Sequence, residues 1–132
     1  MFEQCDFGDG VLRLCFSGPI TAEDESAYIR ALRDLGARQS PFGLLAVLNA
    51  DDGLSPNGRR EQNLLYKQSI EEMNAHCVGL AIVGVRSTPQ MQDAMERLWT
   101  FPVRLAENEC DARWWLGNLI GHRSGGGVAK PE

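Results

Sequence analysis

Apolar residues follow two patterns that alternate along the chain. Short, nearly continuous apolar runs are typical of strands covered on both faces, whereas apolar residues spaced three and four apart are typical of helices with one buried side. The runs lie at Val11–Phe16, Phe42–Leu48, Val78–Val85 and Val103–Ala106. Helical spacing separates them, so the pattern predicts a sheet whose strands are connected by helices.

A β-hairpin opens this pattern. Phe2–Phe7 is short and partly alternating, and Gly8-Asp9-Gly10 separates it from the run that begins at Val11. Two strand-like runs around a Gly-Asp-Gly tip predict a hairpin. The run at Val103–Ala106 is short and contains an arginine, which favours a position near an edge of the sheet.

Capping residues mark four helix starts. Thr21 with Asp24 three residues later fits a capping box, and a proline follows each of the candidate caps Ser55 and Thr88. Asn108 precedes the fourth helix. The helices are therefore expected at about 22–36, 59–75, 89–99 and 109–121, with Gly36 and Gly121 as terminators.

The order of elements is β-β-α-β-α-β-α-β-α, which predicts an α/β fold. Strands separated by helices become parallel neighbours through right-handed crossovers, and the hairpin adds one antiparallel strand. We expect a mixed, mostly parallel sheet with an N-terminal β-hairpin and four helices, in one domain of residues 1–121. Residues 122–132 contain Ser124-Gly125-Gly126-Gly127 and are interpreted as a flexible C-terminal tail.

Length and composition restrict the class of protein. A chain of 132 residues, 43% hydrophobic and 23% charged, suits one globular domain rather than disorder. No apolar run approaches the roughly 20 residues of a membrane-spanning helix, so we do not expect an integral membrane protein. The segment Met1–Asp6 lacks the positive start and apolar core of a signal peptide, which favours a cytoplasmic protein.

Charge argues against a nucleic-acid partner. The 18 acidic residues outnumber the 13 basic ones, which gives a net charge of −5, and the two signs are interspersed without a basic stripe. A phosphate backbone would meet net repulsion from such a surface.

The sequence has no pattern typical of a catalytic or metal site. Cys5, Cys15, Cys77 and Cys110 are far apart and form no C-x-x-C pair, which favours buried free thiols over zinc ligands. The two histidines lie at a predicted helix end and at the start of the tail, away from the strand ends where α/β sites form. We therefore expect no catalytic residue, no metal and no cofactor.

Two loops follow predicted parallel strands. Asp51 and Asp52 lie just beyond the strand at 42–48, so we take Asn49–Asn57 as the candidate contact surface. Gly84-Val85-Arg86-Ser87 leads into a helix and would present amides to an anion, with Arg86 assisting. An ordinary capped turn explains the same four residues.

The pair Trp114-Trp115 cannot face one core together, because neighbouring helical residues point about 100° apart. Trp115 belongs to the apolar stripe of its helix. Trp114 then either packs at a helix edge or stands exposed as an anchor for a partner.

Three segments resemble STAS-like proteins similar to sporulation anti-sigma-factor antagonists. Phe16–Asp24 is similar to the family's opening strand, glycine, hydrophobic-Thr and Glu-Asp sequence, and Leu80–Gly84 is similar to its next diagnostic strand. Arg104-Leu105 with Asp111–Leu116 resembles its closing acidic-Ala-x-x-Trp-Leu helix. Together these segments span most of the chain.

The resemblance implies a small α/β fold without catalysis, used as a docking or switch module. Classical members are phosphorylated on a serine in an Asp-Ser-x-Gly stretch, where this chain has Asp51–Pro56. Asp52 occupies the expected serine position, and Ser55, three residues later, is the candidate phosphorylation site. The most similar subgroup consists of bacterial proteins of unknown function, for which a similarity to lipid-carrying CRAL-TRIO domains has been drawn.

The leading hypothesis is a cytoplasmic, non-enzymatic regulatory module that binds a protein partner. Its predicted partner-binding residues are Asp51, Asp52, Gly53, Leu54, Asn57 and Trp114. The alternative is a carrier of small molecules or lipids, which predicts an apolar cavity between helices and sheet. An enzyme of unrecognised type would need a convergent polar pocket. A homodimer through an edge strand or Trp114 stays open.

Overall fold

Within residues 1–123, five strands form one sheet, in the order in which they occur in the sequence. The computed structural model describes residues 1–123. An antiparallel hairpin is followed by three successive parallel pairings, as predicted. The strands are β1 (Phe2–Asp6), β2 (Val11–Gly18), β3 (Phe42–Ala50), β4 (Cys77–Val83) and β5 (Val103–Leu105).

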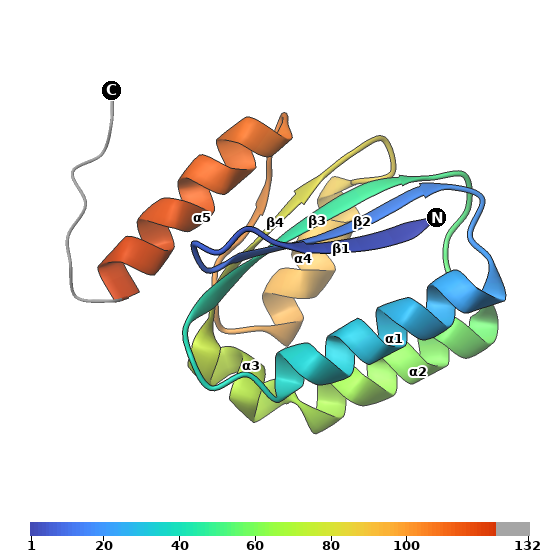
Figure 1. Ribbon diagram of the computed structural model, residues 1–132, viewed down its shortest axis with the longest axis horizontal. Helices are drawn as coiled ribbons and strands as arrows, with labels where there is room; N and C mark the ends of the chain where they lie inside the picture. Colours follow the sequence, from blue (N-terminus) through green and yellow to red (C-terminus); the bar gives the residue numbers. More distant parts are fainter. Residues whose placement is uncertain (124–132) are drawn as a thin grey trace.

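Helices cover both faces of this sheet (Figure 1). Each parallel connection moves one strand onward in the same direction, so right-handed crossovers place their helices on the same face. Among the helices of residues 1–123, only the last packs on the opposite face, against β3 and β4. The helices are α1 (Ala22–Gly36), α2 (Pro56–Gln68), α3 (Ile70–His76), α4 (Pro89–Leu98) and α5 (Glu109–Arg123).

The predicted caps start the helices. At α1 the Thr21 side chain accepts from the Asp24 N–H while the Asp24 carboxylate accepts from the Thr21 N–H, which completes the capping box. Ser55 and Thr88 cap α2 and α4 without the reciprocal bond: their side chains accept from the N–H groups of Gly58 and Met91. Asn108 accepts from the N–H of residue 111 at the start of α5. These side chains satisfy backbone donors that have no partner within the helix.

Two helix predictions are wrong in detail. The single helix expected at 59–75 is two helices, because the chain leaves helical geometry at Ser69 (φ −108°, ψ 12°), whose hydroxyl donates to the Leu65 carbonyl. The structure therefore has five helices within residues 1–123 rather than four. Gly121 does not terminate α5, which runs on to Arg123. The rest of the predicted tail, residues 124–132, lies outside the described residues.

The core has two halves, one on each face of the sheet. On the α5 face, Gly43 and Gly79 let the helix lie close to the strands. A Cβ on Gly43 would lie 3.1 Å from Leu116 Cδ2, and one on Gly79 would lie 2.6 Å from Leu119 Cδ1. Leu116 is consequently fully buried. On the opposite face, larger side chains of the same strands meet helices α1 to α4.

Candidate functional site

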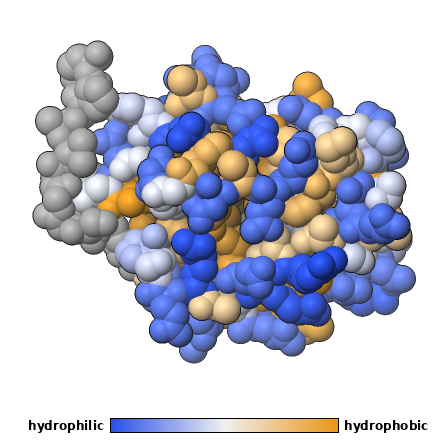
Figure 2. Space-filling view, viewed as in Figure 1, coloured by the Kyte–Doolittle hydropathy of each residue, from blue (hydrophilic) through white to orange (hydrophobic). Residues whose placement is uncertain are grey.

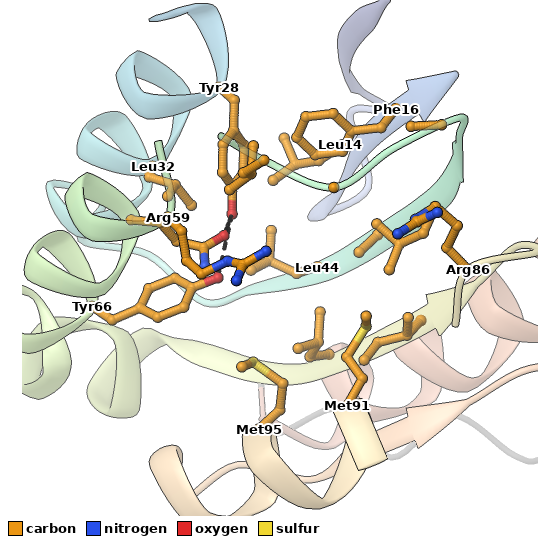
Figure 3. Close-up of a pocket in the computed structure, with 18 of the residues that line it drawn as sticks. Leu14, Phe16, Tyr28, Leu32, Leu44, Arg59, Tyr66, Arg86, Met91 and Met95 are labelled. Atoms are coloured by element: carbon orange, nitrogen blue, oxygen red, sulfur yellow. Dashed lines mark hydrogen bonds between the residues drawn. The ribbon is translucent and has the colours of Figure 1, made fainter. Parts of the chain in front are cut away.

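A cavity of about 360 Å³ lies between the sheet and helices α1, α2 and α4. Its lining is mostly apolar. Figure 3 shows Leu14 and Leu44 of the sheet and Leu32 of α1 facing Met91 and Met95 of α4 across this space. In the view of Figure 2, hydrophobic residues gather in the middle of the molecule and hydrophilic residues surround them.

The cavity remains because α4 does not seal against the sheet. The apolar stripe predicted for this helix is there, but Met91, Met95 and Leu98 are only partly buried and Ala94 is exposed. Trp99, directly after the helix, is the buried member and also lines the cavity. Methionine side chains are flexible and adapt to ligands of different shape, so this wall suits an apolar occupant.

Three polar side chains face the cavity and bind one another. Tyr28 Oη donates to Gln62 Oε1 and lies 3.3 Å from Tyr66 Oη (Figure 3). Since the Tyr28 proton goes to Gln62, Tyr66 is the donor to Tyr28 Oη. Burial raises the pKa of Tyr28 well above its ordinary value and also raises the pKa of Tyr66. Both hydroxyls therefore stay neutral and occupied within the protein.

Two arginines from different elements converge at the mouth of the cavity. A Cβ on Gly53 would lie 3.7 Å from a terminal nitrogen of Arg59 and 3.8 Å from one of Arg86. Arg86 Nη1 donates to the Asp51 carbonyl at 3.2 Å. Among residues 1–123, neither guanidinium forms an ion pair with a carboxylate.

The turn after β4 fixes the position of Arg86. Gly84 has a φ of +113°, and a Cβ there would lie 2.5 Å from the Leu48 carbonyl oxygen, so only glycine fits this approach to β3. The Arg86 N–H donates to the same Leu48 carbonyl at 3.0 Å. Ser87 closes the turn on the Gly84 carbonyl. The turn singled out in the sequence thus holds Arg86 against the end of β3.

Ser55 joins α2 to α1. Its hydroxyl accepts from the Gly58 N–H at 3.0 Å and donates to Glu25 Oε1 at 2.7 Å, while its own N–H donates to Glu25 Oε2 at 2.6 Å. A Cβ on Gly58 would lie 2.5 Å from the same carboxylate, so glycine permits this close approach. A phosphate on Ser55 would meet the Glu25 charge, although phosphorylation of Ser55 stays a prediction.

Most of the predicted contact residues surround this mouth. Asp52, Gly53 and Leu54 line the cavity, and of these only Leu54 is partly buried. Asp51 is exposed beside them, and Asn57 lies in the first turn of α2, where it accepts from Arg60. Their role in binding a partner stays a prediction.

Trp114 does not belong to this group. It lies on α5, across the sheet from the cavity, and its residue is 38% exposed. Its function as an anchor for a partner stays a prediction.

Sequence reasoning did not select Arg59, the buried Tyr28 or the partly buried Gln62 and Tyr66 as site residues. The spacing of Gln62 and Tyr66, one helical turn apart, puts them on the same face of α2 and could have signalled a polar spot facing inward. Arg59 carries no such signal, because an arginine in the first turn of a helix is ordinary on a solvent-exposed face.

No cluster of three or more His, Cys, Asp and Glu residues within 1–123 could hold a metal ion. All four cysteines are free. Cys15 and Cys77 are buried as expected, whereas Cys5 and Cys110 are exposed, so the expectation of buried thiols is wrong for those two. In the part of the chain that the structure describes, no helix is both long enough and apolar enough to cross a bilayer.

No protein-family model matches the sequence, and no curated protein matches it. A solved structure does match: an uncharacterized protein from the DUF3478 family of Shewanella loihica PV-4, with a SpoIIAA-like fold. The TM-score is 0.64 at 20% sequence identity, over 88% of this chain and 92% of that one. This chain therefore has the SpoIIAA-like fold, which is the STAS fold, and the predicted fold class is confirmed.

Proposed function

We propose that this protein is a non-enzymatic, cytoplasmic binding module of STAS fold that holds a small apolar molecule between its sheet and helices. The observation that carries the proposal is the cavity of about 360 Å³ with its mostly apolar lining. Pockets that bind small molecules commonly have about 300–1,000 Å³ and an apolar lining with a few placed polar groups. Of the alternatives considered from the sequence, the small-molecule or lipid carrier is the one that requires such a cavity.

The pairing of the polar groups favours binding over chemistry. Catalysis by acid, base or nucleophile needs a group that is available to the reacting atoms. Tyr28, Gln62 and Tyr66 instead occupy one another, and burial keeps both phenols neutral. Proteins of this fold are also generally non-enzymatic.

The test is binding of 1-dodecanol, a neutral single-chain probe, by native mass spectrometry and isothermal calorimetry. Ala46 lines the cavity, so Ala46→Leu fills part of it and should weaken binding at least tenfold, about 1.4 kcal/mol. Ala94→Leu is the matched control, because Ala94 is exposed on α4. Absence of saturable one-to-one binding, or equal binding by the two variants, would overturn the proposal.

Docking of a protein partner through the loop Asn49–Asn57 is the second candidate. The observation that favours it is the exposure of Asp51, Asp52 and Gly53 at the cavity mouth, where an occupant would alter the surface that a partner meets. Affinity capture with the double variant Asp52→Ala and Leu54→Ala tests this candidate. Loss of the captured partner supports docking through the loop, and retention of every partner contradicts it.

A further inference from the structure

We propose that the occupant of the cavity is a single-chain amphiphile with an oxyanion head group, and that Arg59 and Arg86 hold this head at the mouth. The inference rests on the proposed function and adds the chemical class of the ligand. It depends on three features: the charge at the mouth, the volume of the cavity and the pairing of the polar groups inside.

The charge at the mouth favours an anion. The protein carries a net charge of −5, yet two guanidiniums approach the same point beside Gly53, with no carboxylate in an ion pair with either among residues 1–123. Like charges held together repel one another unless an opposite charge lies between them. A guanidinium binds carboxylate and phosphate oxygens with two parallel hydrogen bonds, so an oxyanion suits this position.

The volume of the cavity favours a ligand with a single alkyl chain. At about 30 Å³ for each group of the size of a water or methylene, a cavity of about 360 Å³ holds roughly twelve such groups. One medium-length alkyl chain fills that space, whereas the two chains of a phospholipid exceed it. The flexible Met91 and Met95 side chains adjust the wall to the chain.

The interior polar groups leave the head group at the mouth. Tyr28 and Tyr66 give their hydroxyl protons within this cluster, so neither phenol offers a free donor to a buried anion, and the cluster contains no positive charge. The charged donors belong to Arg59 and Arg86 at the carboxyl ends of the parallel strands, which is the usual ligand position in α/β sheets. The chain then runs inward past Leu44 and the head stays near solvent.

The negative charge of Asp52 opposes binding of an anionic head group, which allows a second test. It also lines the cavity, it is exposed, and its carboxylate carries the same sign as the head group. Removing that charge should strengthen binding of an anionic ligand and leave a neutral one unaffected. Asp52→Asn is therefore expected to bind dodecanoate about threefold more tightly, which is the effect of a like charge near the protein surface.

The experiment compares dodecanoate, dodecyl phosphate and 1-dodecanol by calorimetry, below their micelle concentrations, on the full chain. Dodecanoate should bind at least tenfold more tightly than dodecanol, because the head gains charge-assisted hydrogen bonds. Arg59→Gln and Arg86→Gln should each lower the affinity for dodecanoate about tenfold and leave the affinity for dodecanol unchanged. Arg60→Gln is the matched control: Arg60 is exposed on the same helix but does not line the cavity.

The outcomes separate the two proposals. Equal affinity for dodecanol and dodecanoate, or equal losses for both ligands in the arginine variants, overturns the oxyanion inference while the apolar cavity function stands. Failure of all three ligands to bind overturns both. Binding of dodecanoate above dodecyl phosphate assigns a carboxylate head, and the reverse assigns a phosphate monoester; either result supports the inference. Unchanged thermal unfolding midpoints confirm that each variant is folded.

Discussion

The two faces of the sheet are covered by helices in different ways. On the α5 face, the strands present glycine and alanine at Gly43, Gly79 and Ala81, and the helix packs directly onto them. On the other face the alternate positions carry residues such as Leu44 and Ile82, and the helices that cover them leave a cavity. Small residues on one face thus make a structural layer, whereas an incompletely filled opposite face leaves room for a ligand.

Truncating one leucine on each face of the sheet should lower the free energy of unfolding by different amounts. Leu116 on α5 is 0% exposed, whereas Leu32 on α1 is 8% exposed and borders the cavity. We expect Leu116→Ala to lower the free energy of unfolding by about 4 kcal/mol and Leu32→Ala by about 2 kcal/mol, because a side chain beside a void has fewer contacts to lose.

Urea denaturation of both variants measures this difference, and helix propensity cancels because each change is Leu→Ala within a helix. A loss for Leu32→Ala that equals or exceeds that for Leu116→Ala would contradict the view that the two faces are packed differently.

Enlarging an alanine should have opposite effects on the two faces. Ala81 on β4 is fully buried against the α5 layer, so Ala81→Leu overpacks it and should destabilise the protein by about 2 kcal/mol. Ala46 on β3 faces the cavity, so Ala46→Leu fills empty space and should stabilise it by about 1 kcal/mol. Thermal unfolding of the ligand-free protein distinguishes the two signs, and destabilisation by both changes would contradict the comparison.

The helix cap at Ser55 should contribute more to stability than the helix cap at Thr88. Ser55 caps α2 and also binds Glu25 of α1, whereas Thr88 caps α4 by the ordinary side-chain acceptance alone. Ser55→Ala should therefore lower the free energy of unfolding by about 1.5 kcal/mol, and Thr88→Ala should lower it by about 1 kcal/mol. A double-mutant cycle of Ser55→Ala with Glu25→Gln isolates the hydrogen bond from the Ser55 hydroxyl to Glu25, and strict additivity would show that this bond contributes nothing.

Acid should destabilise the starts of α1 and α5, one on each face of the sheet. This is the smallest of the expected effects on stability. Backbone N–H donors of Thr21 and Phe2 lower the pKa of Asp24, at the start of α1, from 3.8 to about 2. The hydrogen bond from Arg13 lowers the pKa of Glu109, at the start of α5. A carboxyl whose folded pKa is depressed stabilises the protein above its unfolded pKa, so this stabilisation is complete above about pH 5.

For Asp24 the stabilisation is then lost as the pH falls toward about 2. Carboxyl carbon shifts in an NMR titration measure this midpoint directly. A midpoint for Asp24 near 3.8 would show that the capping box does not hold in solution.

Local chemistry made the fold predictable from the sequence. The strands at 11–18 and 77–83 are nearly continuous apolar runs, and the caps at Thr21, Ser55 and Thr88 are local side-chain to backbone interactions, so a short window of sequence contains their cause. The break at Ser69 was missed because serine is tolerated inside helices, and the departure depends on where α3 must pack.

The candidate site was only partly predictable for the same reason. The position of the loop after β3 follows from the rule that strand ends carry function, and Asp52, Gly53 and Leu54 were found in this way. The cavity depends on how far α4 stands from the sheet, which no local pattern encodes. The approach of Arg59 to Arg86 joins residues on α2 and on the turn after β4, and it appears only after the chain has folded.

The order of the strands has a consequence for the nascent chain. Because strand order follows chain order, each new β-α unit can add to the edge of the sheet already made during synthesis, and α1 to α4 are in place before α5 leaves the ribosome. Until then Val11, Leu45, Val47 and Val83 face water without a cover. The last helix is therefore the cover of this face, and a chain truncated before residue 109 would leave a bare apolar sheet surface that other chains could bind.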